Sequence, residues 1–344
     1  MLIYFITLLS VSFLVAFAMI KRTILFSKLF KIQDQNDSRK IHVEQVSALG
    51  GIGVYFGILA GSFLAIFMGI PYPGMLAILI FPLFFLGIWD DAYKVPVKTR
   101  LLVQFGTASL IWLMGYRLPG FPDWLILAGF LNFGCSFFFI LLLINAYNLI
   151  DGINGLCGGL AVIGFTVLGG LFLFIGAVGF GAFSFIAAAA VLAFLIFNFG
   201  TAKIFLGDNG STVVGFLIAA LILKFIGLDS HLPEPSTSLW LIAISICLIP
   251  VTDLIKVSIS RIFNRRSPFS PDRTHIHHFL VDRGYSHFLA ASMLYTVQVI
   301  LVGIAIGGMT AGVSKASGCL GFFSLFYYTL FVFSAAKNNS VQWI

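Results

Sequence analysis

Several carboxylate and amide side chains in this sequence stand directly after apolar runs. Asp90 and Asp91 are adjacent within residues 89–104 (WDDAYKVPVKTRLLVQ), and Lys98 and Arg100 follow them. Adjacent carboxylates can ligate a divalent cation, whereas lysine and arginine side chains bind phosphate. This segment therefore predicts a place where a cation and a phosphate group meet.

A second group lies in residues 145–159 (NAYNLIDGINGLCGG), where Asn148, Asp151 and Asn154 are interspersed with glycines. Their side chains offer hydrogen-bond donors and acceptors, and glycine allows a ligand to approach the backbone closely. A turn between two helices would not need these side chains. We expect this segment to bind a ligand, and a plain turn is the alternative.

The third group, residues 202–212 (AKIFLGDNGST), places Asp208 between two glycines. Ser211 and Thr212 are candidate N-caps for the helix that follows. A glycine-flanked carboxylate at a helix start suits a bound phosphate or a metal-bound carboxylate. Asp208 is therefore a candidate metal ligand.

The fourth group, residues 267–280 (SPFSPDRTHIHHFL), contains Arg273, His275, His277 and His278. Three imidazoles this close could bind Zn²⁺, but the carboxylates elsewhere are hard oxygen ligands that suit Mg²⁺ or Mn²⁺. We therefore favour an anion-binding role for these histidines together with Arg273.

The elements that position these groups are membrane helices. The 344 residues are 60% hydrophobic and only 10% charged, whereas soluble domains have roughly 25% charged residues. This composition excludes a water-soluble domain and predicts one all-α integral membrane domain over residues 1–344. About eleven apolar runs are long enough to cross a bilayer, or ten if the runs beside Gly176 and Gly179 are one. They are residues 2–20, 49–70, 75–89, 101–116, 125–145, 156–176, 179–199, 212–228, 239–258, 288–308 and 319–336.

The charged residues predict the topology. Seventeen of the 20 lysines and arginines fall in alternate loops or after the last span, and the positive-inside rule then places the N-terminus outside and the C-terminus in the cytoplasm. Ten of the 13 acidic residues lie on the same side. Loops 21–48, 90–100, 146–155, 200–211 and 259–287 are therefore expected to form a cytoplasmic active site.

This distribution argues against two other functions. The basic residues lie between apolar runs and are explained by topology, so no nucleic-acid partner is expected. A secondary transporter would place ionisable residues near the bilayer midplane, whereas the acids here lie at helix ends. Asp253, near the inner end of the ninth span, is interpreted as a partner of Lys256 or an interfacial residue, with a functional role as the alternative.

The four groups, in this order, resemble the polyprenyl-phosphate N-acetylhexosamine-1-phosphate transferases. The string from Ser267 to His278 is most similar to the WecA-like branch, which uses undecaprenyl phosphate and UDP-N-acetylglucosamine. Residues 34–42 with Gly50 and Gly51 match a fifth block of the family in outline, and the resemblance extends over residues 34–288.

The resemblance implies an enzyme that transfers N-acetylglucosamine-1-phosphate from a UDP-sugar to undecaprenyl phosphate and releases UMP. It implies Mg²⁺ (or Mn²⁺) as cofactor and the bacterial inner membrane as location, with envelope glycan synthesis as the pathway. A family member that uses another UDP-sugar, such as UDP-MurNAc-pentapeptide or a UDP-N-acetylated deoxyhexose, is the alternative. A homodimer is left open.

The resemblance also implies roles for individual residues. Asp208 is expected to be the principal Mg²⁺ ligand with Asp91 as its support, and Asp90 is expected to deprotonate or orient the lipid phosphate. A covalent intermediate on an aspartate is the competing mechanism. Asn154 stands where the family usually has aspartate, and its amide can still pair with uracil. Two larger groups have binding roles by the same resemblance. The nucleotide sugar is expected to contact Asn148, Asp151, Asn154, Arg273, His275, His277 and His278, and phosphate is expected to contact Lys98, Arg100, Arg39 and Lys40.

Overall fold

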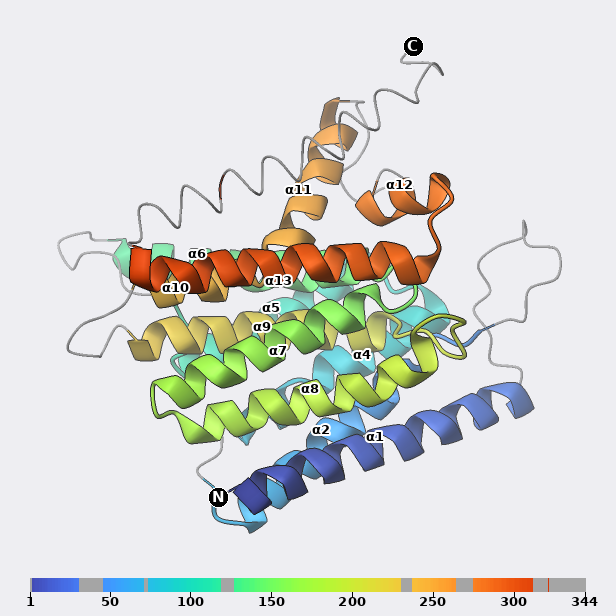
Figure 1. Ribbon diagram of the computed structural model, residues 1–344, viewed down its shortest axis with the longest axis horizontal. Helices are drawn as coiled ribbons and strands as arrows, with labels where there is room; N and C mark the ends of the chain where they lie inside the picture. The colour runs from blue at the N-terminus through green and yellow to red at the C-terminus, as the bar shows by residue number, and fades with distance from the viewer. Residues whose placement is uncertain are drawn as a thin grey trace.

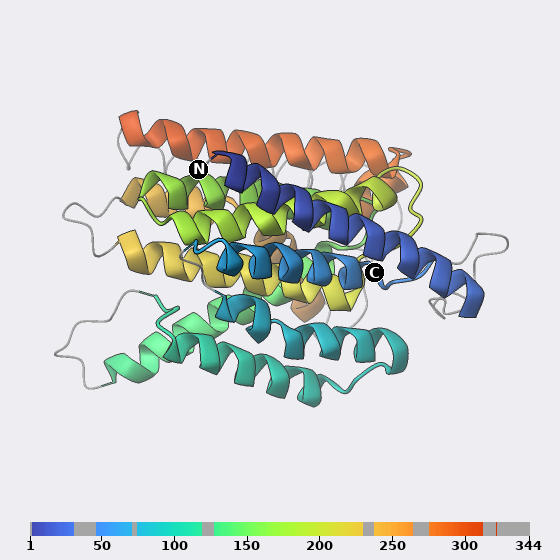
Figure 2. The same cartoon turned by 90° about the horizontal axis from the view of Figure 1, so that it is seen from below.

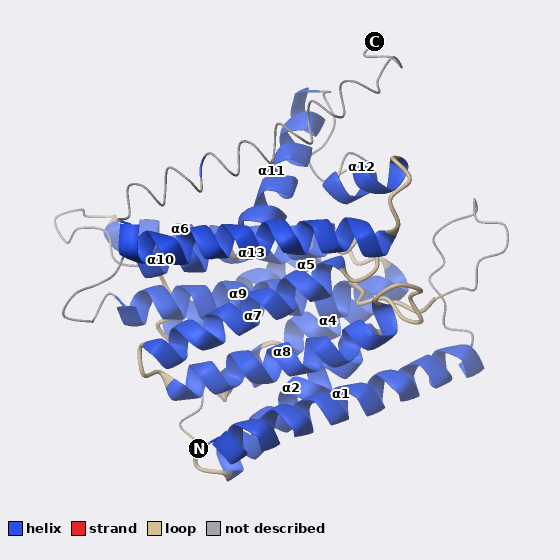
Figure 3. Ribbon diagram, in the orientation of Figure 1, coloured by secondary structure: helices blue, strands red, loops and turns tan. Residues whose placement is uncertain are grey.

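The computed structural model describes residues 2–30, 46–70, 74–118, 127–229, 237–263, 275–311 and 321. Within these ranges the regular structure is helical and no strand is present (Figure 3). The helices are α1 (Leu2–Phe30), α2 (Gly50–Phe67), α3 (Met75–Leu79), α4 (Phe81–Tyr93), α5 (Val97–Leu113), α6 (Ala128–Ile150), α7 (Leu156–Phe174), α8 (Val178–Asn198), α9 (Asp208–Asp229), α10 (Thr237–Ser245), α11 (Leu248–Phe263), α12 (Ile276–Asp282) and α13 (His287–Ala311).

In the described part of the chain, eight helical segments are long and apolar enough to cross a membrane. Each of them overlaps a span that the sequence predicts, which confirms an all-helical polytopic membrane protein. The predicted span 101–116 coincides with α5, which has 17 residues. Apart from residue 321, the predicted span 319–336 lies outside the described residues, as does the predicted C-terminus.

Three predicted boundaries were wrong. The first helix does not end before Lys21 and Arg22 but continues to Phe30, so these cations lie on exposed positions of α1. The run 75–89 is divided into α3 and α4, and the run 239–258 into α10 and α11. A proline lies in the first turn of α4 (Pro82) and of α11 (Pro250), where a missing N–H leaves no helical acceptor unpaired.

The buried centre of the bundle is α9. Its residues from Val213 to Leu223 are fully or almost fully buried, and α9 contacts α2, α4, α6 and α7 (Figures 1 and 2). A Cβ on Gly215 would lie 2.5 Å from the carbonyl oxygen of Leu143 in α6. Because apolar surface meets equally apolar lipid in a bilayer, such close backbone packing contributes much of the association between membrane helices.

The polar ends of these helices gather at one end of the bundle. The end of α4, the starts of α7 and α9, and helix α12 lie together, opposite the end marked N in Figure 1. The C-terminal end of α11 leans away from the bundle in the same view. The chain segments that carry the predicted site residues therefore converge in space.

Replacing Gly215 should loosen the contact between α9 and α6. Gly215→Ala places a methyl group against the Leu143 carbonyl, and overpacking of this kind costs about 1–3 kcal/mol. We expect a lower Tm in detergent. Gly170→Ala is the matched control, because a Cβ at this exposed position of α7 meets nothing within 4 Å; equal Tm values for the two variants would contradict the packing argument.

Candidate active site

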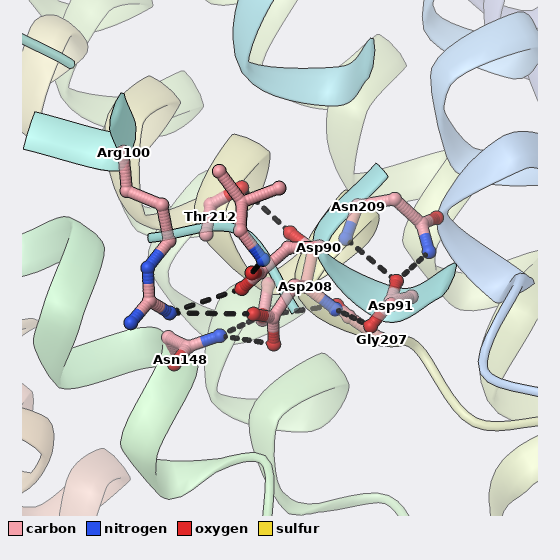
Figure 4. A network of polar contacts seen from close by, with 10 residues as sticks. Asp90, Asp91, Arg100, Asn148, Gly207, Asp208, Asn209 and Thr212 are labelled. Atoms are coloured by element: carbon pink, nitrogen blue, oxygen red, sulfur yellow. Dashed lines mark hydrogen bonds and ion pairs between the residues drawn. The ribbon is translucent and has the colours of Figure 1, made fainter. Parts of the chain in front are cut away.

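Asp90 joins the end of α4 to the start of α5. Its Oδ1 accepts a hydrogen bond from the Val95 amide (2.6 Å), and its Oδ2 accepts one from Nη1 of Arg100 (3.0 Å; Figure 4). Between them, Lys94 ends α4 in the left-handed conformation, with φ of +51°. The carboxylate of Asp90 therefore closes the turn and fixes the guanidinium of Arg100 beside it.

Asp91 caps the N-terminus of α9. Its Oδ1 accepts from the amide of Asp208 (3.1 Å), and its Oδ2 accepts from the amide (3.3 Å) and the side-chain Nδ2 (2.6 Å) of Asn209. The first amides of a helix have no acceptor within the helix, and a carboxylate placed there also lies at the positive end of the helix dipole. Asp91 thus holds the residue that the sequence predicts as the metal ligand.

Asn209 completes this contact from α9. Its Nδ2 also donates to the carbonyl oxygen of Ala48 (2.7 Å), and its side chain is fully buried. Three glycines surround it: a Cβ on Gly51, Gly87 or Gly207 would come within 3 Å of Asn209 atoms. Gly207 moreover has φ of +73°, a conformation that glycine adopts readily. We call Asp91, Asn209 and these three glycines the α9 joint.

Asp208 faces an open space at the end of the bundle. Its Oδ1 accepts from Nδ2 of Asn148 (2.7 Å), its Oδ2 lies 4.0 Å from Nη1 of Arg100, and 32% of the side chain is exposed. A hard oxygen ligand that is held on one side and open on the other can take part in binding a cation.

The predicted N-caps of α9 were wrong. The helix begins at Asp208, so Ser211 and Thr212 lie within its first turn, where their hydroxyls donate to the carbonyl oxygens of Gly207 (3.0 Å) and Asp208 (2.6 Å). The Ser211 hydroxyl also accepts from Asn148 (3.1 Å). The capping function belongs to Asp91, on a different helix.

Asp151, between α6 and α7, lies close to the other carboxylates. Burial is the main cause that raises its pKa well above the usual range for aspartate, and the charges of Asp208 and Asp91 add to this effect. A hydrogen bond from the Gly207 amide lowers the pKa in part. Each negative charge here therefore disfavours ionisation of the next, and a bound cation would relieve that repulsion.

A cavity of about 740 Å³ extends from these carboxylates between α4, α5, α6 and α11. Asp208 and Thr212 at the start of α9 belong to its lining, and most of its non-polar lining is leucine, isoleucine, valine and phenylalanine. The polar and charged residues of the lining are Asp90, Arg100, Gln104, Asn145, Asn148, Asp208, Thr212, Ser258, Arg261 and His275.

The predicted site residues are brought together only in part. Asp90, Arg100, Asn148, Asp208 and His275 line the cavity, with Asp91 and Asp151 close to Asp208. Asn154 instead donates to the Gly200 carbonyl (2.7 Å) and joins two neighbouring loops. Lys98 is exposed and is not among the lining residues. Arg39, Lys40 and Arg273 lie outside the described residues, and of His277 and His278 only the backbone in α12 is described.

The structure adds residues that the sequence did not single out. Arg261 was counted only as a topology signal, but it is buried and lines the cavity. Asn209 carried no signal beyond its place in the GDNG string, because its partners lie far away in sequence. His275 has Asp253 as its partner (2.8 Å), a pair that no local pattern reveals.

Together, the apolar helices and the carboxylates around Arg100 at one end of them are those of a multi-pass membrane protein with a charged, partly buried site. Residues 74–226 match the model of glycosyl transferase family 4. The undecaprenyl-phosphate alpha-N-acetylglucosaminyl 1-phosphate transferase of Escherichia coli K12 is 30% identical over 289 residues, 81% of this chain and 77% of that protein.

Two further relatives agree. The enzyme with this description in Salmonella typhi is 32% identical over 282 residues, 79% of this chain and 75% of its own length. A probable undecaprenyl-phosphate N-acetylglucosaminyl 1-phosphate transferase of Bacillus subtilis 168 is 32% identical over 273 residues, 78% of this chain and 74% of its own length. The chain therefore belongs to glycosyl transferase family 4.

The role of the α9 joint can be tested without an activity assay. Asn209→Ala removes the donors to Asp91 and Ala48, which should destabilise the protein by about 1–3 kcal/mol and speed hydrogen exchange in residues 207–213. Asn132→Ala serves as control, because Asn132 bonds the carbonyl of Leu118 (2.7 Å) and the indole of Trp112 (3.0 Å) away from this joint. The control should also lose stability but keep slow exchange at 207–213; an Asn209 variant with unchanged exchange there would refute the role of this side chain.

Proposed function

We propose that this protein transfers N-acetylglucosamine-1-phosphate from UDP-N-acetylglucosamine to undecaprenyl phosphate and releases UMP. The names of its relatives support the reaction. The observation that carries the proposal is a cavity whose walls are largely apolar and whose lining includes Asp90, Arg100 and Asp208. One substrate of this reaction has a long apolar tail and a phosphate, and this cavity offers an environment for each.

The apolar wall suits the acceptor. Leu101 on α5, Leu142 on α6 and Ile255 on α11 are among the residues that face the cavity, and a prenyl chain can pack on such side chains without leaving an apolar environment. Its phosphate then lies near Arg100, which Asp90 holds in place. An oriented guanidinium binds phosphate oxygens in a fixed geometry.

The donor set fits Mg²⁺. Asp208, Asp91 and Asp151 offer hard oxygen ligands, and the repulsion of Asp208 with Asp91 and Asp151 favours a cation between them and the substrates. In the described part of the chain no three His, Cys, Asp or Glu side chains are grouped as a complete metal cage. Mg²⁺ commonly uses one or two carboxylates, waters and substrate phosphates, so we assign Asp208 as the ligand and Asp91 as its support. When bound, the ion would neutralise charge on the phosphates.

The residues then act by positioning. An oxygen of the lipid phosphate attacks the phosphorus next to the sugar, a new P–O bond forms, and the bond to the UMP oxygen breaks. A phosphate monoester is largely dianionic near pH 7, so Asp90 need only orient Arg100 and the acceptor. Both Asp90 oxygens already accept hydrogen bonds, which supports direct attack over a covalent intermediate on this residue.

The phosphates of the nucleotide sugar are assigned to the same cavity, next to Asp208. Asn148 lies on the cavity and contacts Asp208, and His275 lines the same cavity. Asp151, Asn154, Arg273, His277 and His278 stay proposals for the donor, and Lys98, Arg39 and Lys40 stay proposals as supplementary phosphate cations. The concentration of basic residues on one side supports a cytoplasmic site in the bacterial inner membrane with the N-terminus outside.

Purified protein in nanodiscs should release UMP from UDP-N-acetylglucosamine only when undecaprenyl phosphate and Mg²⁺ are both present. A parallel arm with UDP-MurNAc-pentapeptide and other UDP-N-acetylhexosamines tests the donor. Faster release from another donor would transfer the proposal to that sugar. Absence of release with every donor would refute the enzymatic function, and a transporter would then be tested by uptake.

Asp208→Asn should lower kcat by at least about 100-fold, because a neutral amide binds the cation weakly and stabilises less charge in the transition state. The asparagine keeps the shape of the side chain, so the Tm should change little. Asp282→Asn, at an exposed position near the end of α12, is the matched control and should keep full activity. Near-normal turnover by the Asp208 variant would remove this residue from the site.

A further inference from the structure

Asp253 is a buried carboxylate that the proposed reaction does not yet use. It lies on α11, and only 3% of its surface is exposed. Its Oδ2 lies 2.8 Å from Nδ1 of His275, and its Oδ1 accepts from the amide of Ile276 (2.8 Å). One side chain therefore joins α11 to the start of α12, 22 and 23 residues further along the chain.

The contact to Ile276 caps α12. His275 is the N-cap residue of this helix, and its own side chain makes no capping bond. The amide of Ile276 is a first-turn donor without an acceptor in the helix, and the carboxylate of Asp253 supplies that acceptor. The start of the helix that carries His277 and His278 is therefore attached to α11.

The contact to His275 determines which ring nitrogen carries hydrogen. An ionised carboxylate can only accept, so Nδ1 of His275 is the donor in this contact. Whenever the ring carries a single hydrogen, Nε2 on its opposite side is then the acceptor. His275 is itself 4% exposed and lines the cavity with Asn148 and Asp208. Its tautomer and its orientation are thus determined by a residue on another helix.

We propose that Asp253 is a positioning residue for the transfer reaction. It acts through His275, whose ring it holds toward the cavity in one tautomer, and it anchors α12 by the Ile276 amide. This inference rests on the proposed function, in which His275 contacts the phosphates of the nucleotide sugar. Burial of a carboxylate has a large desolvation cost that only good partners offset, and its partners include a candidate substrate-binding ring and the first amide of the helix that follows it.

Asp253→Asn tests the tautomer. Its Oδ1 can still accept from Ile276, so its amide nitrogen faces Nδ1 and donates to it, which moves the ring hydrogen to Nε2. We expect kcat to fall about 10- to 100-fold, the range found when a carboxylate partner of a functional histidine is lost. The KM for undecaprenyl phosphate and the Tm should stay near wild type. Asp282→Asn is again the carboxylate control, and it should match wild type.

A double-mutant cycle tests whether Asp253 acts through His275. If it does, Asp253→Asn should cost at most about a further twofold once His275→Ala is present. If the contact between Asp253 and His275 only stabilises the fold, its loss should instead lower Tm in each variant and leave kcat of the folded fraction unchanged. Full additivity of the two losses in kcat, or a wild-type kcat in Asp253→Asn, would overturn the proposal.

Two variants of His275 test the proposal independently if Asp253→Asn does not fold. His275→Asn retains an N–H that can reach Asp253 but has no atom at the Nε2 position. The longer side chain of His275→Gln places a polar atom near the Nε2 position but weakens the hydrogen bond to Asp253. The proposal predicts that His275→Asn folds and has a greatly reduced kcat. An active His275→Asn would overturn it. Failure of wild-type protein to release UMP would instead refute the proposed function, so the two failures are distinguishable.

Discussion

The carboxylate of Asp91 and the first amides of α9 form the contact on which the arrangement of the site depends. The N-terminus of α9 begins inside the protein, where its amides cannot all reach water, and unpaired amides there would be costly. Asp91 reaches them from a helix 117 residues earlier in the chain. Because Asp208 is the first residue of α9, the bond that satisfies its backbone also determines where its carboxylate lies.

The contact between Asp91 and the start of α9 brings several carboxylates together and so concentrates negative charge. Asp90, Asp91, Asp151 and Asp208 lie near one another, and Arg100 is the cation that the structure shows beside two of them. The amide dipoles at the start of α9 offset part of the repulsion. The remaining excess lowers the stability of the folded protein, and the divalent cation that we propose to bind at this end of the cavity would offset it. Stability and cation binding are therefore opposed in this part of the molecule.

Hydropathy predicted the eight described segments that are long and apolar enough to cross a membrane, because each span must satisfy its backbone internally and present apolar side chains to lipid. It also placed Asp90, Asn148 and Asp208 at helix ends on one side. It could not show where helices break, because the runs 75–89 and 239–258 remain apolar across their turns. Nor could it reveal α12, whose seven residues are too few for a periodic pattern and whose first amide is capped from α11.

The same limit applies to individual side chains. Asp91 and Asp90 are neighbours of one type in the sequence, yet one caps a helix and the other holds an arginine. The difference arises from the 100° rotation between successive residues of α4, which directs the two carboxylates to different partners. Asp253, Asn209 and Arg261 were undervalued for a related reason: their roles depend on residues that become neighbours only after the helices have packed.

The α9 joint also restricts how this protein can change over generations. A single substitution can replace Asn209 by another side chain, and the protein would then lose its hydrogen bonds to Ala48 and Asp91. Substitution of Gly51, Gly87 or Gly207 is different, because the added Cβ would clash with backbone atoms of another segment. A replacement there requires backbone atoms of α9 or of Ala48 to move. Mutation can therefore change the side chains that line the cavity more easily than it can change the position of the start of α9.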